Sequence, residues 1–218
     1  MKAIITCVDY DDYLSITLPH NKQYFENILI ITSKADATTQ KLAKEQEVEL
    51  LVTNSFYENG DVFNKGRAIN RALPALKDQW ICHLDADIWY HTPPPEETNL
   101  IKGNIYGCSR LMCPNKAAWN CYLDGGSTKK WRKFSPSYFQ LDNQIINQYL
   151  PLGYTQIFFN DNNVAYPENS SDASESDLRF SLSFNEQICL PYSVIHLPPI
   201  GEIAEGANWR GRVTPRFS

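Results

Sequence analysis

The chain has 218 residues, 43% of them hydrophobic and 12% aromatic, which suits one globular domain with a full-sized core. Its formal net charge is -5, so no global basic field attracts nucleic acid or an anionic membrane. No apolar run reaches the length of a membrane span, and residues 1–8 turn polar too soon for a secretory signal. The six cysteines lack the close paired spacing of a zinc site or a disulfide framework, so we expect a reducing, cytoplasmic setting.

The first half of the sequence predicts alternating strands and helices, because short β-branched runs are separated by capped, amphipathic segments. In chain order these are strand 3–8, helix 14–27 interrupted near Pro19, strand 28–32, helix 36–46 with Asp36 as N-cap, strand 48–52, helix 63–73 and strand 80–85. Such alternation predicts a parallel sheet with right-handed crossovers.

Two aspartates one residue apart, Asp85 and Asp87, end the last of these strands. Side chains of a strand alternate faces, so both carboxylates would project from the same side. They repel each other unless a cation lies beside them. Hard oxygen ligands at the carboxyl end of a central strand suit Mg²⁺ or Mn²⁺ carrying a phosphate-bearing ligand. The alternative is the polar end of a strand that enters a loop, and this motif alone does not decide between the two.

Lys65 and Arg67 fall in the first turn of the predicted helix 63–73, where the helix dipole disfavours cations. This local conflict indicates an anionic ligand nearby, such as a diphosphate. The alternative is a pair of solvated basic side chains.

The second half of the sequence is more irregular. The predicted elements are strand 105–110, helix 141–150 with Ile145, Ile146 and Tyr149 on its buried side, a polar functional loop 167–177, helix 178–184 capped by the Ser176/Asp177 region, and strand 192–197 ending at His196. Two segments, 129–134 and 208–216, interleave basic and aromatic residues. Such a run is usually a solvated loop, but here these residues could also meet an anionic acceptor.

Taken in order, these pieces resemble the nucleotide-sugar-dependent glycosyltransferases of the GT-A fold, most closely the family-2-type enzymes. The matching pieces are Asp9-Tyr10 after the first strand, the helix start 63–70, Asp85-Ala86-Asp87, the acidic segment 176–180, and the late His196. The resemblance implies an α/β fold: a single GT-A (Rossmann-like) domain over 1–218 with a mostly parallel central sheet flanked by helices. Residues 1–90 would form the nucleotide-binding half and 91–218 the acceptor-binding half.

The resemblance also implies roles for individual residues. Asp87 and His196 would ligate a divalent metal, with Asp85 holding the ribose or a metal-bound water. Asp177 would be the general base; many members have Glu-Asp where this chain has Ser176-Asp177, so Glu175 is the rival. Donor-binding positions would be Thr6, Asp9, Tyr10, Lys65, Asn70, Asp85 and Ala86. Acceptor-binding positions would be Trp131, Trp209, Arg210 and Arg212.

The function implied is a metal-dependent, inverting transfer of a sugar from a nucleoside-diphosphate-sugar, expected to be a UDP-sugar, to an acceptor hydroxyl, with Mn²⁺ or Mg²⁺. The acceptor would be a surface glycan or a hydroxymethylated DNA base in a phage, although the acidic net charge opposes tight duplex binding. One alternative is a nucleotidyltransferase that makes a nucleotide-sugar. Such enzymes usually carry a Gly-rich basic loop after the first strand, where this chain has Asp9-Tyr10-Asp11-Asp12. The other is a non-catalytic nucleotide-sugar-binding module. The sequence predicts no oligomeric state.

Overall fold

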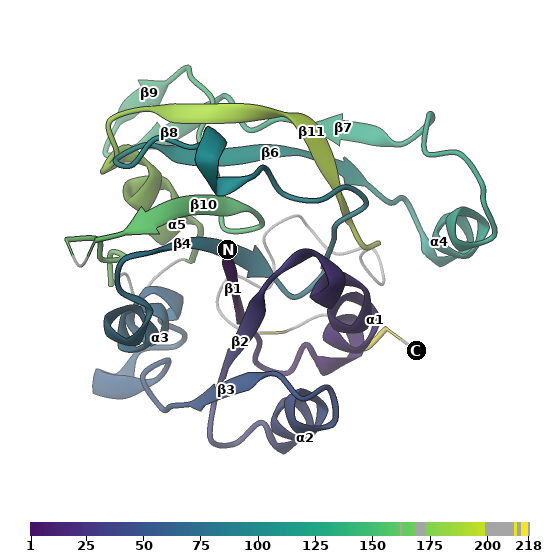
Figure 1. Ribbon diagram of the computed structural model, residues 1–218, viewed down its shortest axis with the longest axis horizontal. Helices are drawn as coiled ribbons and strands as arrows, with labels where there is room; N and C mark the ends of the chain where they lie inside the picture. Colours follow the sequence, from purple (N-terminus) through teal and green to yellow (C-terminus); the bar gives the residue numbers. More distant parts are fainter. Residues whose placement is uncertain (162, 169–172, 199–211, 213–214, 218) are drawn as a thin grey trace.

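A central sheet between two pairs of helices organises the chain (Figure 1). The computed structural model describes the chain apart from residues 162, 169–172, 199–211, 213–214 and 218. Its helices and strands are β1 (Lys2–Thr6), α1 (Asp11–Asn21), β2 (Asn27–Thr32), α2 (Ala37–Glu45), β3 (Glu49–Val52), α3 (Lys65–Ala72), β4 (Gln79–Asp85), β5 (Ile88–Trp89), β6 (Ile105–Met112), α4 (Lys116–Leu123), β7 (Arg132–Phe134), β8 (Phe139–Leu141), β9 (Gln144–Ile146), β10 (Gln156–Asn160), α5 (Ala173–Leu182) and β11 (Gln187–His196).

Among the described residues, nine strands form the main sheet in the order β3-β2-β1-β4-β10-β6-β11-β5, with β7 beside β6. Strands β3, β2, β1 and β4 are parallel, as are β6 and β11, whereas β10 runs antiparallel between β4 and β6. The predicted mixed α/β architecture with a mostly parallel sheet of the GT-A type is therefore confirmed. Strand β10 was not predicted.

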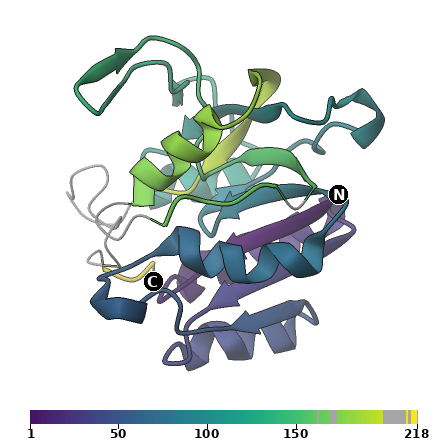
Figure 2. The same cartoon turned by 90° about the vertical axis from the view of Figure 1, so that its left-hand side faces the viewer.

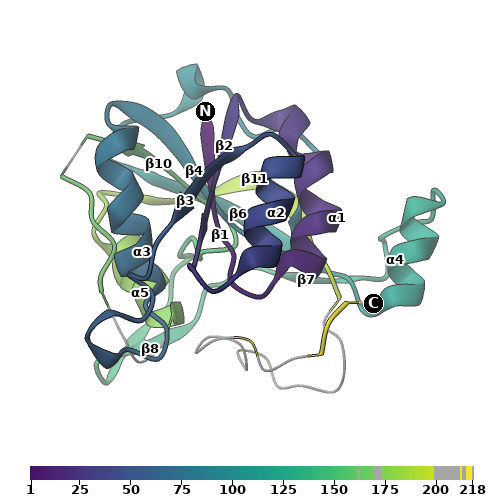
Figure 3. The same cartoon turned by 90° about the horizontal axis from the view of Figure 1, so that it is seen from below.

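Helices cover both faces of the sheet, and residue alternation along the strands decides which core each side chain joins. On β1, Ala3 and Ile5 pack with Leu14 and Leu18 of α1, whereas Ile4 belongs to the core that holds α3. Seen from below, α1 and α2 lie on one side and α3 and α5 on the other (Figure 3), and Figure 2 shows the second pair from the front. By the same alternation, the side of β4 that carries Ile81 and Asp85 faces α3 and α5.

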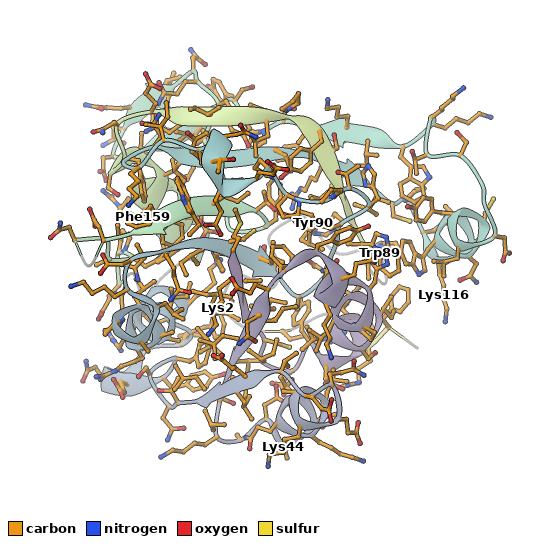
Figure 4. All side chains as sticks on the ribbon, viewed as in Figure 1. Lys2, Lys44, Trp89, Tyr90, Lys116 and Phe159 are labelled. Carbon is orange, nitrogen blue, oxygen red and sulfur yellow. The ribbon has the colours of Figure 1, made fainter. Side chains whose placement is uncertain are left out.

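Part of the segment between β6 and β10 leaves the body of the sheet, although β7 returns to pair with β6. It carries α4, which projects sideways (Figure 1), and is anchored by aromatic contacts. Trp89, labelled in Figure 4, stacks on His20 of α1 and meets Trp119 of α4 edge-on, with ring centroids 3.5 and 5.0 Å apart.

The prediction of a helix over residues 141–150 is wrong. Residues 139–146 form an antiparallel hairpin, β8–β9, separate from the main sheet. Its two central residues, Asp142 and Asn143, both have positive φ, 49° and 61°, which is the backbone of a tight type I′ turn. Ile145, expected in the core, is 61% exposed.

Two other helices differ from their predicted limits. Helix α1 begins at Asp11 rather than at residue 14, because Asp11 and Asp12 occupy the first turn, where the helix dipole favours carboxylates. The helix also continues through Pro19. Helix α5 begins at Ala173, so Glu175, Ser176 and Asp177 lie inside the helix rather than on a loop or at its cap. Among the described residues no helix is long and apolar enough to cross a membrane.

Candidate active site

The ends of two distant chain segments bring Asp87 and His196 together. β5 pairs with β11 so that Ile88 lies opposite His196, and the Leu197 N–H donates to the Asp87 carbonyl at 2.9 Å. These backbone contacts place Nε2 of His196 3.5 Å from Oδ2 of Asp87. Both side chains are mostly buried.

The tautomer of neutral His196 follows from its other ring nitrogen. Nδ1 lies 2.9 Å from the Leu197 carbonyl oxygen, which can only accept, so Nδ1 carries a hydrogen and Nε2 of the neutral ring holds a lone pair. In this form Nε2 faces the carboxylate of Asp87 as a second acceptor. Oδ1 of Asp87 is also buried and has no hydrogen-bond partner among the described residues. Two opposed acceptors are favourable only with a cation or a proton between them.

The pair fits a divalent cation. At metal–ligand bonds of about 2.1 Å, two ligands at roughly 90° to 110° lie about 3.0 to 3.5 Å apart, which is the observed spacing. Burial, with a contribution from Asp85, raises the pKa of Asp87, whereas His196 opposes that rise. In the described part of the chain, no group of three or more His, Cys, Asp or Glu side chains surrounds one centre. The protein would thus supply two ligands and leave the other positions to phosphate oxygens and water, as Mg²⁺ and Mn²⁺ sites commonly do.

Asp85 lies beside a second charged cluster rather than within the Asp87–His196 pair. Lys65, the first residue of α3, is buried with its Nζ 3.7 Å from Oδ1 of Asp85. The same Nζ lies 3.0 Å from both carboxylate oxygens of Asp177 on α5. The helix start is fixed by Asn64, whose side chain caps the Arg67 N–H at 3.0 Å.

A glycine lets the chain pass close to this cluster. A Cβ added at Gly153 would lie 2.4 Å from Oδ2 of Asp177 and 2.5 Å from Nζ of Lys65, so only glycine fits without a shift. The backbone of Gly153 also opposes the rise in the pKa of the Asp177 carboxyl group. Residue spacing carries no signal for this glycine, because a close approach of this kind is set by tertiary packing.

The pKa values of the two carboxyl groups in the cluster are shifted in opposite directions. Burial raises the pKa of Asp177 to about 6, although Lys65 opposes the shift. Burial would lower the pKa of Lys65, but Asp177 and Asp85 together raise it. Desolvation disfavours the charged form of Asp85, yet Lys65 holds the pKa of that carboxyl below its usual range. At neutral pH the cluster therefore holds the Lys65 ammonium ion and two carboxylates, and the carboxylate of Asp177 is the more basic of the two.

A buried polar network that sequence reasoning missed lies on the same side of β4. The Gln156 amide donates to the Pro151 and Asp177 carbonyls, so its oxygen accepts from Tyr166 Oη at 2.8 Å. Tyr166 Oη lies 3.0 Å from Nδ1 of His83. Burial, aided by the charge of Lys65, lowers the pKa of His83 to about 3, so this histidine is neutral at pH 7.

The turn after β1 is held by residues distant in sequence. Asp9 has a φ of 59°, and its N–H donates to Oδ2 of Asp36 at 2.8 Å. Asp36 also caps α2 through the Thr39 N–H, as predicted. Thr6, at the end of β1, lies opposite Asp85 in the parallel pairing, so the predicted donor-binding positions Thr6, Asp9 and Asp85 share one edge of the sheet.

The other predicted donor-binding residues have clear structural partners. The Asn70 side chain binds the backbone N–H and carbonyl of Tyr166 at 2.8 and 2.9 Å. Ala86 is buried, and its carbonyl accepts from Thr17 Oγ1 at 2.7 Å. Arg67 pairs with Asp61 and Glu168, so the sequence conflict at this helix start is resolved partly by carboxylates of the chain itself.

Of the four predicted acceptor-binding residues, the structure describes Trp131 and Arg212. Trp131 packs near Tyr122 of α4, with ring centroids 5.6 Å apart. Arg212 instead contacts the turn after β1, donating to the Asp9 carbonyl at 2.7 Å. Trp209 and Arg210 lie outside the described residues. Glu175, the rival base, pairs with Arg179 at 2.7 Å near the protein surface.

Fold and geometry together define a GT-A-type α/β domain with a cation-compatible Asp–His pair and a buried Lys–Asp cluster at the carboxyl edge of the sheet. The chain matches no protein-family model and no curated protein. A solved structure described only as a mycobacterial protein is 14% identical, with 96% of this chain and 70% of that chain covered and a TM-score of 0.53, which shows a shared fold.

Weaker similarities concern two synthases. One is glucosyl-3-phosphoglycerate synthase from Mycobacterium tuberculosis, solved with Mn²⁺, UDP-glucose and glycerol 3-phosphate: 12% identity, 90% and 71% coverage, TM-score 0.48. The other is mannosyl-3-phosphoglycerate synthase from Rubrobacter xylanophilus: 16% identity, TM-score 0.38, with 53% of this chain covered. The chain spans only 40% of the length of that second synthase.

Proposed function

We propose that this protein is a metal-dependent glycosyltransferase that moves a sugar from a nucleoside-diphosphate-sugar, foremost a UDP-sugar, to an acceptor hydroxyl with inversion. One observation carries the proposal: His196 Nε2 lies 3.5 Å from Oδ2 of Asp87, a spacing suited to a shared Mn²⁺ or Mg²⁺. This pair lies at the edge of the sheet where open α/β folds bind nucleotides.

The charge of each residue indicates the role that we assign to it. The cation held by Asp87 and His196 would neutralise the negative charge that develops on the departing diphosphate. Asp9 and Tyr10, on the turn after β1, would hold the base and ribose. Lys65 is a buried cation beside the same edge that pairs with the carboxylates of Asp85 and Asp177, and it would assist the binding of a donor phosphate.

Asp177 is the candidate general base. In an inverting displacement the acceptor oxygen attacks the anomeric carbon, its proton passes to the carboxylate, and the bond to the diphosphate breaks. A base works best when its pKa lies near the operating pH, and a pKa of about 6 leaves Asp177 ionised at pH 7 with appreciable basicity. Glu175 is engaged with Arg179 outside the cluster and is the weaker candidate.

The test is release of nucleoside diphosphate from a panel of nucleotide-sugars with Mn²⁺, with a chelator, and after Mn²⁺ is restored. We expect slow, Mn²⁺-dependent release that is lost in Asp87→Asn and His196→Gln. Asp78→Asn is the matched control, because Asp78 lies at the opposite end of β4, is exposed, and has a positive φ that Asn tolerates. Pyrophosphate chemistry with a sugar phosphate would point to a nucleotidyltransferase, and donor binding without turnover would point to a binding module.

A further inference from the structure

The end of the chain docks on the turn that follows β1. Arg212 donates to the Asp9 carbonyl at 2.7 Å and to Oδ2 of Asp12 at 2.8 Å, and its guanidinium lies 4.7 Å from the centre of the Tyr10 ring. Phe217 packs against Tyr13 with ring centroids 5.2 Å apart. The ion pair of Arg212 with Asp12 is almost fully buried, with 7% of each side chain exposed.

The turn held in this way is strained. Asp9 adopts a φ of 59°, a left-handed conformation that is uncommon outside glycine and costs free energy. Such a conformation persists only where the surroundings impose it. Here both backbone polar groups of Asp9 are bound by side chains from distant segments, the N–H by Asp36 and the carbonyl by Arg212.

We propose that Arg212 is a positioning residue for nucleotide binding: it holds the Asp9 turn in its left-handed conformation, so that Asp9 and Tyr10 are arranged for the base and ribose of a nucleoside diphosphate before that ligand binds. The inference rests on the proposed function, in which this turn contacts the donor. It gives Arg212 a role on the donor side rather than the acceptor role expected from the sequence.

Arginine suits this role for a geometric reason. Its planar fork reaches the Asp9 carbonyl and the Asp12 carboxylate at once, while its face covers Tyr10. A lysine keeps the charge but cannot make these bonds together. Arg216 provides a matched control, because it is in the same tail and pairs with Asp11. Among the described residues its side chain is hydrogen-bonded only to that carboxylate, so its loss leaves the Arg212–Asp9 bond in place.

The experiment measures binding of UDP in the presence of Mn²⁺ by calorimetry, and hydrogen exchange of the Asp9 amide by NMR. The proteins are wild type, Arg212→Ala, Arg212→Lys and Arg216→Ala, each checked for cooperative thermal unfolding. We expect Arg212→Ala to weaken UDP binding by about tenfold or more and to speed exchange of the Asp9 amide, since the ligand must then impose the strained turn. Arg212→Lys should be intermediate and Arg216→Ala close to wild type. In turnover, donor KM should rise while kcat at saturating donor changes little.

Unchanged UDP affinity and unchanged Asp9 exchange in both Arg212 variants would overturn the inference, as would equal losses in Arg212→Ala and Arg216→Ala. The two proposals fail in different ways. If wild type does not bind UDP with Mn²⁺, the donor assignment fails; if wild type binds and the Arg212 variants bind equally well, only the positioning role fails. Should Arg212→Ala not fold, Arg212→Lys carries the same comparison.

Discussion

Replacing Asp177 by Asn separates a catalytic base from a structural ion-pair partner. For an ordinary buried ion pair, removal of one partner destabilises a protein by about 3–5 kcal/mol. The structure predicts a different result, because burial raises the pKa of Asp177 by more than the charge of Lys65 lowers it. The pKa of Asp177 is about 6, compared with an ordinary value of 3.8. That difference means that the ionised Asp177 carboxylate destabilises the folded state by at most about 3 kcal/mol at pH 7. Lys65 would still have Asp85 at 3.7 Å.

We therefore expect Asp177→Asn to be at least as stable as wild type at pH 7 while its transfer rate falls by roughly 10²-fold or more. The sign with pH follows from the raised pKa. Between about pH 6 and pH 4 the folded state takes up the Asp177 proton before the unfolded state does, so this group contributes stability to wild type as the pH falls, and the Asn variant lacks that contribution. Wild-type transfer should also decline as the pH falls through about 6, because the base becomes protonated.

The assay pairs urea unfolding at several pH values with transfer rates and with UDP binding, which should be nearly unchanged. Glu175→Gln is the control carboxyl variant and should keep most of the activity. A variant Asp177→Asn that loses about 3 kcal/mol yet turns over normally would refute the reasoning, since Asp177 would then serve only as the partner of Lys65. Normal turnover of Asp177→Asn together with an inactive Glu175→Gln would exchange their roles.

Two further predictions concern the surroundings of the cluster. Gly153→Ala places a methyl group against Asp177 and Lys65, so we expect a stability loss of about 1–3 kcal/mol in urea unfolding, together with lower activity. His83, whose pKa burial lowers to about 3, contributes a loss of stability as the pH falls from about 6.5 towards 3, because the unfolded state binds the proton first; this contribution is opposite in sign to that of Asp177. His83→Gln should flatten the acid side of a plot of Tm against pH, and an unaltered slope would contradict this.

Local signals explain what could be predicted from the sequence. The strands β1 to β4 are short apolar runs flanked by recognisable caps, and Asp36 caps α2 as expected. The Asp85-Ala86-Asp87 motif was located because it directly follows such a run. Helix 141–150 was wrong for an equally local reason: apolar residues at positions 141 and 145 fit a helical period, but Asp142-Asn143 adopts a tight turn, and turn chemistry outweighed periodicity.

The remainder of the site could not be predicted, because it depends on pairing between distant segments. Gln156 meets His83 only through the antiparallel pairing of β10 with β4, a strand that was not predicted. The close approach of Gly153 to Asp177, and the return of Arg212 to Asp9, likewise leave no trace in residue spacing. Buried polar contacts of this kind are visible only in the folded chain.

The central claim is that Asp87 and His196 share one divalent cation with a nucleoside diphosphate. Pulsed EPR of the protein with Mn²⁺ and UDP tests it directly, since a coordinated imidazole couples its nitrogen to the manganese spin. We predict a nitrogen coupling in wild type that disappears in His196→Gln and persists in the control His91→Gln. A Mn²⁺–UDP complex with no nitrogen coupling, or with one that persists in His196→Gln, would contradict the proposed site.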